Sequence, residues 1–254
     1  MIVLLPPSET KRSGGRRVRD WLDRLACPEL AEQRALVLAA LSQLSTDHDA
    51  AVRVLGLGKT QHDQVVLNRD LPTGPVLPAV DRYTGVLYDA LDAGTLDTSA
   101  RGWLRRNVMI HTAALGIVGA LDGIPNYRLG AAANLPGLPP LRQVWASPVS
   151  SALASGVLPS AGFVLDLRSE AYVALGPVPD AVASGYVRVV TRGPDGATRA
   201  LNHFNKHTKG ALVRHLAQDR PRIGSRAGFL RWAQRAGWDV QNNAHGELEL
   251  VIRE

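Results

Sequence analysis

The sequence predicts a single α/β domain in which a mixed β-sheet is flanked by helices. Short apolar runs of strand length alternate along the chain with segments whose apolar residues recur at helical spacing. No linker-like or repeated stretch divides these segments, so residues 1–254 are expected to form one domain. With 254 residues and 45% hydrophobic residues, such a chain can bury roughly 70–75% of its unfolded surface without disulfides or metal.

The first predicted element is a buried strand that leads into a basic loop. Residues 2–5 are all apolar, and a pair of prolines ends the run. The loop at residues 8–17 is polar and basic, and loops that follow buried strands carry ligand-binding groups in many α/β proteins. A helix is expected over residues 28–44, which open with a proline.

Residues 52–60 contain Gly58-Lys59-Thr60, which matches the second half of a phosphate-binding loop. The full motif needs another glycine five positions before Gly58, and Arg53 stands there. The backbone could then not close around a phosphate in the usual way. We therefore interpret this segment as two helices separated by a glycine break.

The middle of the chain alternates between helical and extended patterns. We expect a loop turning into a helix at 78–92, a helix at 98–106, a strand at 107–112, an apolar helix with two glycines at 114–122, and an extended segment at 124–130. A helix at 139–154, strands at 163–167 and 186–191, a hairpin turn at 192–196, a helix at 227–236 and a strand at 247–253 complete the pattern.

A basic stretch around Lys206 and Lys209 holds two of the four lysines in the chain. Thr208 is a plausible N-cap for a helix over residues 211–218, in which Leu212 and Leu216 share the buried face. The start of this helix would then offer unpaired N–H groups, the positive end of the helix dipole and two ammonium groups. This arrangement suits a phosphate or a carboxylate, but a solvated basic turn explains the same residues equally well.

The composition limits the classes of function. A formal net charge of +6 favours an anionic partner, such as nucleic acid or a phosphorylated small molecule, although an arginine-rich composition alone also makes a protein basic. Cys27 is the one cysteine, which excludes an intrachain disulfide and a thiolate metal cage. Without a long apolar run or a charged leader, the protein is expected to be cytoplasmic and not membrane-bound.

Several short motifs, in order along the whole chain, resemble one family, the YaaA-like proteins associated with peroxide stress. The matching segments are Pro7-Ser-Glu-Thr10, Tyr83-Thr-Gly85, Pro125-Asn-Tyr-Arg-Leu129, Arg168-Ser-Glu-Ala-Tyr172, Lys206-His-Thr-Lys-Gly210 with Arg214, and Ala244-His-Gly-Glu-Leu248. Three positions depart from the pattern. Glu9 stands where some members have lysine, Gly130 stands where some have an acid, and Trp145-Ala-Ser replaces Trp-Gly-Asp.

The resemblance implies a basic cleft, a helix-hairpin-helix-like element, binding of double-stranded or distorted DNA, and a role in limiting iron-driven oxidative damage. Residues 115–120 could supply the hairpin, whose glycines would expose backbone N–H groups to phosphate. However, Gly116 and Gly119 are three apart and not in the tighter Gly-x-Gly arrangement. Close helix packing is therefore the favoured explanation of these glycines.

DNA binding is the first functional hypothesis. Phosphate contacts set affinity without reading sequence, so cations from separated loops could share one cleft. The expected DNA- or anion-binding residues are Lys11, Arg82, Tyr127, Arg128, Lys206, Lys209 and Arg214, with Arg12 as a further candidate cation and Ser8, Thr10, Tyr83 and Thr84 as further cleft residues.

The alternative is an enzyme that acts on a nucleobase, a nucleotide or another phosphorylated small molecule. Glu170 or Glu9 would serve as general base beside Ser169, and Lys206 or Arg128 would stabilise the anion. Glu170 has a simpler explanation, because carboxylates are favoured in the first turn of a helix.

No metal or cofactor site is expected. His203 and His207 are four apart, as two ligands on one helical face would be, but the cap assigned to Thr208 argues against a helix there. No carboxylate lies nearby in the sequence. The sequence pattern predicts no particular oligomeric state.

Overall fold

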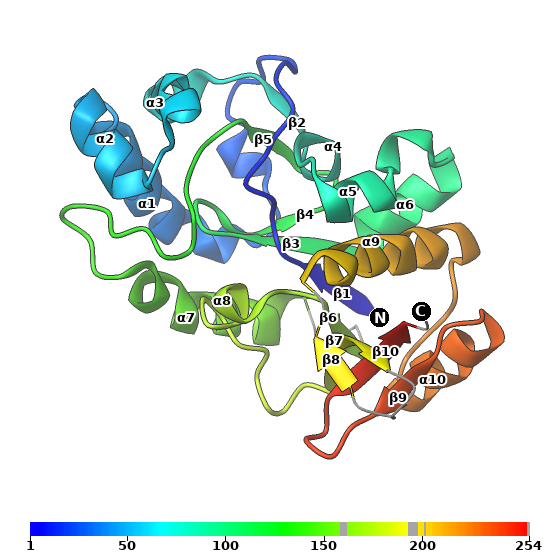
Figure 1. Cartoon of the computed structure of the whole chain (residues 1–254). Helices are drawn as coiled ribbons and strands as arrows, with labels where there is room; N and C mark the ends of the chain where they lie inside the picture. Colours follow the sequence, from blue (N-terminus) through cyan, green and yellow to red (C-terminus); the bar gives the residue numbers. More distant parts are fainter. Residues whose placement is uncertain (158–161, 193–197, 201, 253–254) are drawn as a thin grey trace.

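The computed structural model describes residues 1–157, 162–192, 198–200 and 202–252, and it has the expected α/β architecture (Figure 1). The main sheet runs in the order β4-β3-β1-β6-β7-β10-β9, and β8 pairs with β7. Strands β3, β1, β6, β7 and β10 are parallel, whereas β4, β8 and β9 pair antiparallel with their neighbours. The bounds are β1 Ile2–Leu5, β3 Val108–Thr112, β4 Gly116–Gly119, β6 Val164–Asp166, β7 Ser184–Arg192, β8 Thr198–Ala200, β9 Val240–Asn242 and β10 Leu248–Ile252.

Helices flank this sheet, and a small antiparallel pair, β2 (Val76–Pro78) with β5 (Gly123–Pro125), lies apart from it. The helices are α1 Ala31–Leu44, α2 His48–Leu55, α3 Val65–Arg69, α4 Ala79–Arg82, α5 Val86–Leu91, α6 Thr98–Asn107, α7 Leu141–Ala152, α8 Glu170–Val173, α9 Asn202–Asp219 and α10 Arg226–Arg235. Short 3₁₀ turns join several of them: η1 Leu22–Arg24, η2 Pro28–Leu30, η3 Lys59–Gln64, η4 Leu71–Thr73 and η5 Ala93–Thr95. One π-helical turn, η6 (Leu153–Val157), follows α7.

Strand β1 is the centre of the fold. Its four residues are all buried, and it lies between β3 on one side and β6 on the other. The chain therefore goes to one side of β1 first and returns later to the other side. In open α/β sheets, ligands bind beyond the carboxyl ends of strands at such a reversal of strand order. The loops that begin after β1 and β6 meet at this edge of the sheet.

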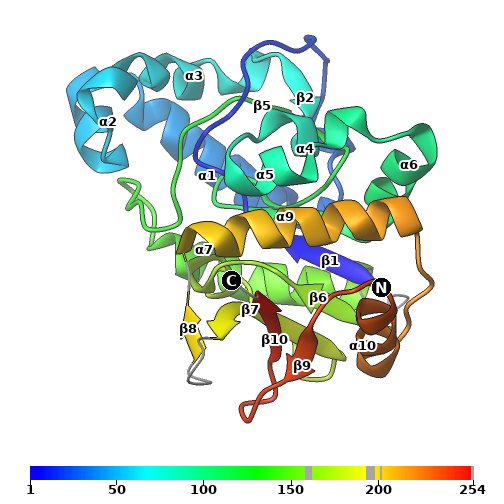
Figure 2. The ribbon, with the colours of Figure 1, turned by 45° about the vertical axis from the view of Figure 1, so that its right-hand side comes forward.

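Helix α9 covers one face of the sheet and packs against α5 and α6 (Figure 2). Gly210 makes the approach to α5 possible, because a Cβ at this position would lie 2.0 Å from the backbone oxygen of Leu87. Leu212 and Leu216, about half a turn around α9 from Gly210, are also fully buried.

The predicted start of this helix is wrong. Helix α9 begins at Asn202, so Thr208 is an interior residue and not the N-cap. Lys209 lies on the same face of α9 as the buried Leu212 and Leu216, and burial of that face favours extending the helix through this position. Lys206 and Lys209 therefore lie within the helix, and the free helix start that we expected around them does not exist.

The predicted helix at residues 114–122 is also wrong. Residues 116–119 form strand β4, which makes a hairpin with β3. Gly116 has φ +63°, and a Cβ there would lie 2.8 Å from the indole of Trp145. Both glycines therefore lie in a strand, and Gly116 leaves room for the Trp145 ring that packs against it. The β-branched residues Ile117 and Val118 also fit a strand better than a helix. The segment assigned to the helix-hairpin-helix-like element is therefore a β-hairpin strand.

The other elements agree with the sequence pattern to within a few residues. The strands expected at 2–5, 107–112, 163–167, 186–191 and 247–253 are present, as are helices at 28–44, 98–106, 139–154 and 227–236. The glycine break is confirmed, since Gly56 ends α2 with φ +62°. The turn predicted at 192–196 falls almost entirely outside the described residues. In the described part of the chain, no helix is long and apolar enough to span a membrane.

Candidate anion-binding site

The loop after β1 is fixed by the turn at Tyr83-Thr84-Gly85. Thr10 accepts a backbone hydrogen bond from Thr84 N, and its hydroxyl donates back to Thr84 O. Gly85 has φ +92°, and a side chain there would crowd the hydroxyls of Thr10 at 3.2 Å and Ser8 at 3.3 Å. A glycine is therefore required where the two segments approach, and the predicted residues Ser8, Thr10, Tyr83 and Thr84 do come together.

Lys11 lies at the centre of this region. Its Nζ donates to the backbone oxygens of Ser8 at 3.1 Å and Glu9 at 3.3 Å. The same atom lies 4.2 Å from the ring centroid of Tyr127 and 5.4 Å from that of Tyr83. Burial lowers the pKa of Lys11 to about 7, with Arg128 contributing in the same direction and Glu9 opposing.

Arg128 connects the same loop to the segment after β5. Its guanidinium donates to the Glu9 carboxylate at 2.9 Å and to the Glu9 backbone oxygen at 3.1 Å. Asn68 holds the backbone of Arg128 through two hydrogen bonds of 2.7 and 2.8 Å. Lys11 and Arg128, predicted from distant parts of the sequence, thus belong to one cluster. We name it the Lys11 cluster, and it consists of Glu9, Lys11, Tyr83, Tyr127 and Arg128.

The two tyrosines of the Lys11 cluster are both buried, and their phenolic oxygens are 2.7 Å apart. Burial raises the pKa of Tyr127 to about 12 and that of Tyr83 well above its ordinary value. Both phenols are therefore neutral near pH 7, and they provide hydroxyl groups and ring faces but no negative charge.

A hollow of about 670 Å³ opens beside this cluster, at the ends of β1 and β6 and along the middle of β7. We call it the strand-end hollow, and its polar lining residues are Ser169, Glu170, Tyr186, Arg188, Asn205, Lys206 and Lys209. Pro6, at the start of the Lys11 loop, also lines it. Four residues predicted for the site, namely Ser169, Glu170, Lys206 and Lys209, are therefore neighbours in one concavity.

The charges in the strand-end hollow are partly compensated. Arg188 bonds to Glu170 at 3.0 Å and to Glu247 at 2.6 Å. Lys209 is 5% exposed, lies 5.7 Å from the Tyr186 ring centroid, and has its pKa lowered to about 8 by burial, which Asp166 opposes. Lys206 is exposed on the same helix. Glu170 opens the short helix α8, in agreement with the simpler explanation of this residue.

A buried network of Asp166, Arg168 and His111, none of which is a predicted site residue, lies behind the strand-end hollow. The Arg168 guanidinium binds both carboxylate oxygens of Asp166, at 2.9 and 2.7 Å, and lies 2.9 Å from His111 Nδ1. Burial and Arg168 lower the pKa of His111 well below its ordinary value, so the ring is neutral. Because arginine can only donate, Nδ1 accepts and Nε2 carries the proton. Among the described residues Nε2 has no partner.

The side chains of Arg82 and Arg214 are bound to backbone and side-chain groups of the protein itself. Arg82 is fully buried and donates to the backbone oxygens of Arg12, Gly14, Pro75 and Ile124. Arg214 donates to the backbone oxygens of Leu91 and Asp92 and to the Thr95 hydroxyl. Both side chains therefore hold loops in place.

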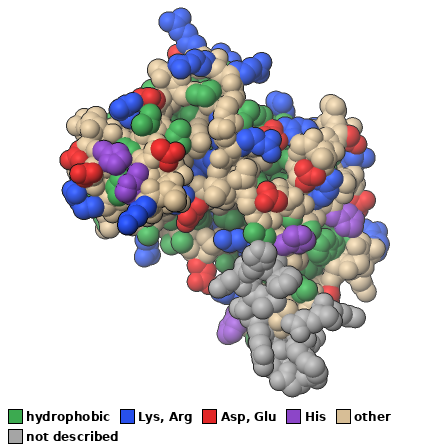
Figure 3. Space-filling view, turned by 45° about the horizontal axis from the view of Figure 1, so that its top comes forward, with side chains coloured by type: hydrophobic (Ala, Val, Ile, Leu, Met, Phe, Trp, Pro, Cys, Tyr) green, Lys and Arg blue, Asp and Glu red, His purple; other side chains and the backbone are tan. Residues whose placement is uncertain are grey.

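Arg12 is exposed, as a phosphate-binding residue requires, and the site prediction missed three further exposed arginines in the same loop, namely Arg16, Arg17 and Arg19. The basic composition of the loop was the available signal. Figure 3 shows basic side chains projecting from the upper edge of the molecule, where Figure 1 places this loop, while acidic and basic groups are mixed over the rest of the visible face.

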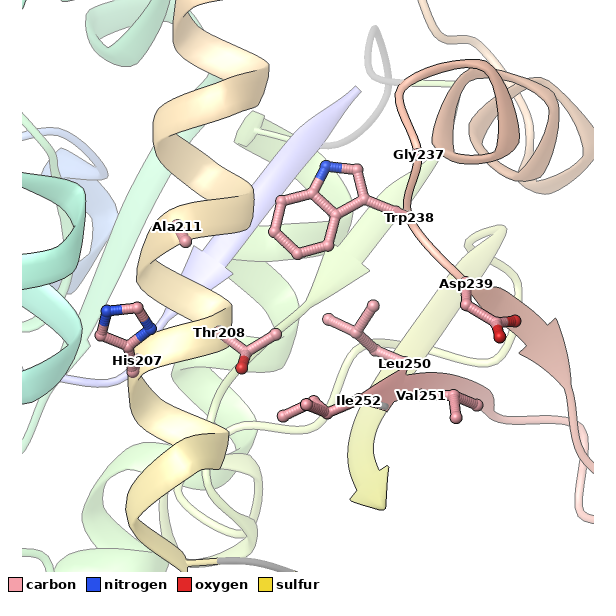
Figure 4. A pocket seen from close by; sticks show the side chains of 9 residues that line it. All are labelled: His207, Thr208, Ala211, Gly237, Trp238, Asp239, Leu250, Val251 and Ile252. Carbon is pink, nitrogen blue, oxygen red and sulfur yellow. The ribbon is translucent and has the colours of Figure 1, made fainter. Parts of the chain in front are cut away.

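A separate hollow of about 560 Å³ lies between α9 and β10 (Figure 4). Trp238, Leu250 and Ile252 give it a mainly apolar lining, and His207 and Thr208 border it from α9. Among the described residues, no group of three or more His, Cys, Asp or Glu side chains is placed to hold a metal ion.

Comparisons with known proteins agree over nearly the whole length. A family model described as "Peroxide stress protein YaaA" matches residues 1–243. The chain is 42% identical over 257 residues to a UPF0246 protein of Corynebacterium efficiens and 39% identical over 256 residues to one of Corynebacterium glutamicum, with 99% of each chain covered. A UPF0246 protein of Streptomyces coelicolor is 40% identical over 221 residues, which cover 85% of this chain and 82% of the relative.

Proposed function

The chain belongs to the YaaA peroxide stress protein family, and from this premise we propose that it binds DNA through the phosphate backbone. The observation that carries the proposal is the group of four exposed arginines at positions 12, 16, 17 and 19. Their side chains form no hydrogen bond or ion pair with any residue that the structure describes. They are therefore available to phosphates without first breaking an internal contact.

Lys206, which lines the strand-end hollow, is a further exposed cation. The other cations named for the site, Lys11, Arg82, Arg128, Lys209 and Arg214, are buried or have partners within the protein. If roughly four to six phosphates are neutralised, the logarithm of affinity should fall with the logarithm of salt concentration with a slope of about −4 to −5. Contacts of this kind are independent of base sequence.

The link to peroxide stress follows from the family, and it is part of the proposal. A protein that covers the DNA backbone limits the access of iron-derived oxidants to the sugars and bases beneath it. This role needs no metal bound to the protein.

A salt titration with duplex DNA tests the proposal. Lys206→Ala and the double variant Arg16→Gln, Arg17→Gln should each bind less tightly, and the slope should become shallower by about 1 for each phosphate that the variant no longer neutralises. Arg142→Gln removes an exposed arginine from α7 and is the matched control. Binding that does not depend on salt, or that all variants retain, would contradict the proposal.

A second candidate function is an enzyme that acts on a nucleotide or another phosphorylated small molecule. The strand-end hollow supports it, because about 670 Å³ is within the usual size range of small-molecule sites. In this alternative Glu170 is the general base, Ser169 lies beside it, and Lys206 and Lys209 stabilise the anion. Thermal-shift screening with nucleobases and nucleotides tests it. A rise in melting temperature with one compound, and a change in that rise in the Glu170→Gln and Lys206→Ala variants, would favour the enzyme.

A further inference from the structure

Arg128 is held in position independently of its ion pair with Glu9. Asn68 fixes its backbone, and the backbone oxygen of Glu9 accepts from one end of the guanidinium. The side chain of Arg128 is only 13% exposed, whereas that of Glu9 is 79% exposed. The carboxylate is thus the solvent-exposed half of the pair, and it can leave without disturbing the position of Arg128.

The surroundings of Arg128 are poor in negative charge. Lys11 and Arg82 lie close enough to influence each other electrostatically, and both donate to backbone oxygens and not to carboxylates. Glu9 is the acidic side chain that pairs with this group in the described structure. A second oxyanion between Arg128 and Lys11 would therefore be electrostatically favoured.

We propose that Arg128 and Lys11 form a subsite for a small oxyanion, a phosphate or a carboxylate group, which Glu9 occupies until the ligand displaces it. Glu9 acts as an internal competitor for the guanidinium. This subsite goes beyond the DNA contact proposed above, which uses the exposed arginines of the following loop.

Binding at this subsite is coupled to protonation of Lys11. An oxyanion beside Nζ favours the ammonium, so binding near or above pH 7 takes up a proton and affinity falls as the pH rises. The other groups that face Lys11 keep their charge in this range. Burial lowers the pKa of Arg82 only to about 10, raises the pKa of Tyr127 to about 12, and raises the pKa of Tyr83 well above its ordinary value.

Calorimetric titration of the full chain with orthophosphate and, separately, with acetate tests this subsite. Glu9→Gln should bind about two- to five-fold more tightly than the wild type, which is the strength of an exposed ion pair. Glu32→Gln, an exposed acid on α1, is the matched control and should bind as the wild type does. The anion that binds with the higher affinity then shows whether the subsite takes a phosphate or a carboxylate group.

Two further measurements make the test specific. Titrations in buffers with different ionisation enthalpies should reveal proton uptake at about pH 8, and Lys11→Met should abolish it. Equal affinity of Glu9→Gln and wild type, or no saturable binding of either anion, would overturn the subsite. Because DNA is absent from these experiments, their outcome does not depend on the DNA-binding proposal.

Discussion

Tyr83 and Tyr127 share a hydrogen bond of 2.7 Å between their phenolic oxygens directly beside the ammonium group of Lys11. Tyr83 comes from the turn after α4, and Tyr127 comes from the segment after β5. The bond therefore joins two parts of the chain that both contact the loop after β1. It fixes the ring faces against which Lys11 lies.

The Tyr83→Phe variant removes one partner of this bond. The buried Tyr127 hydroxyl then loses one of its two side-chain partners and keeps Thr112, so its desolvation cost is compensated less well. The free energy of unfolding should fall by about 1–2 kcal/mol. Urea denaturation followed by tryptophan fluorescence measures this change.

The matched control is Tyr186→Phe, whose half-buried ring lies below Lys209 and whose hydroxyl has no hydrogen bond to the described residues. It should change stability by less than about 0.5 kcal/mol. The double variant Tyr83→Phe, Tyr127→Phe should lose less free energy of unfolding than the two single variants lose together. Full additivity would show that the two hydroxyls do not depend on each other.

Replacement of Arg168 by methionine should be among the most destabilising changes in the protein. The guanidinium is fully buried, and its loss leaves the Asp166 carboxylate buried without its charge partner. Breaking a buried ion pair from one side costs about 3–5 kcal/mol. The free energy of unfolding from urea denaturation should fall by this amount.

Arg69→Met provides the comparison on the surface. Arg69 pairs with Asp70 at 3.1 Å, but both side chains are more than half exposed. Its removal should cost about 0–1 kcal/mol. A similar loss for both arginines would mean that the Asp166–Arg168–His111 network contributes nothing beyond an ordinary surface pair.

The sequence was sufficient to predict the part of the site that depends on local pattern. A buried strand that ends in two prolines and a polar loop identified the region of Glu9 and Lys11, and the motif at Pro125–Leu129 identified Arg128. Parallel strands bring their carboxyl ends to one edge, so a meeting of these loops with Ser169 and Glu170 could be expected. The structure places all of these residues at that edge.

The remaining errors concern residues whose environment is set by distant contacts. Arg82 and Arg214 donate hydrogen bonds to backbone oxygens of segments distant in the sequence. The sequence alone does not distinguish such an arginine from an exposed one. The start of α9 depends on packing against α5, and the strand at Gly116 depends on the indole of Trp145. Local propensity cannot reveal such tertiary partners.

Two helical glycines should respond in opposite ways to alanine. Gly210→Ala places a methyl group 2.0 Å from the Leu87 backbone oxygen, so α9 and α5 must separate and stability should fall by about 1–3 kcal/mol or more. Gly102→Ala meets only the flexible end of Arg106 at 3.4 Å and should raise stability by about 0.5–1 kcal/mol through helix propensity. Thermal and urea denaturation of both variants measure the contrast, and equal effects would contradict the close approach.

Lys209 should give the stability of the protein a distinct pH dependence. Burial lowers its pKa in the folded protein to about 8 from an ordinary value of 10.5, so between these values the unfolded chain holds a proton that the folded protein has released. Stability therefore rises with pH through this window. Between about pH 8 and about pH 10 the free energy of unfolding of the wild type should therefore rise relative to that of Lys209→Met, as measured by urea denaturation. Gln218→Met, at the exposed end of α9, should show a constant difference, and a constant difference for Lys209→Met would refute the assigned shift.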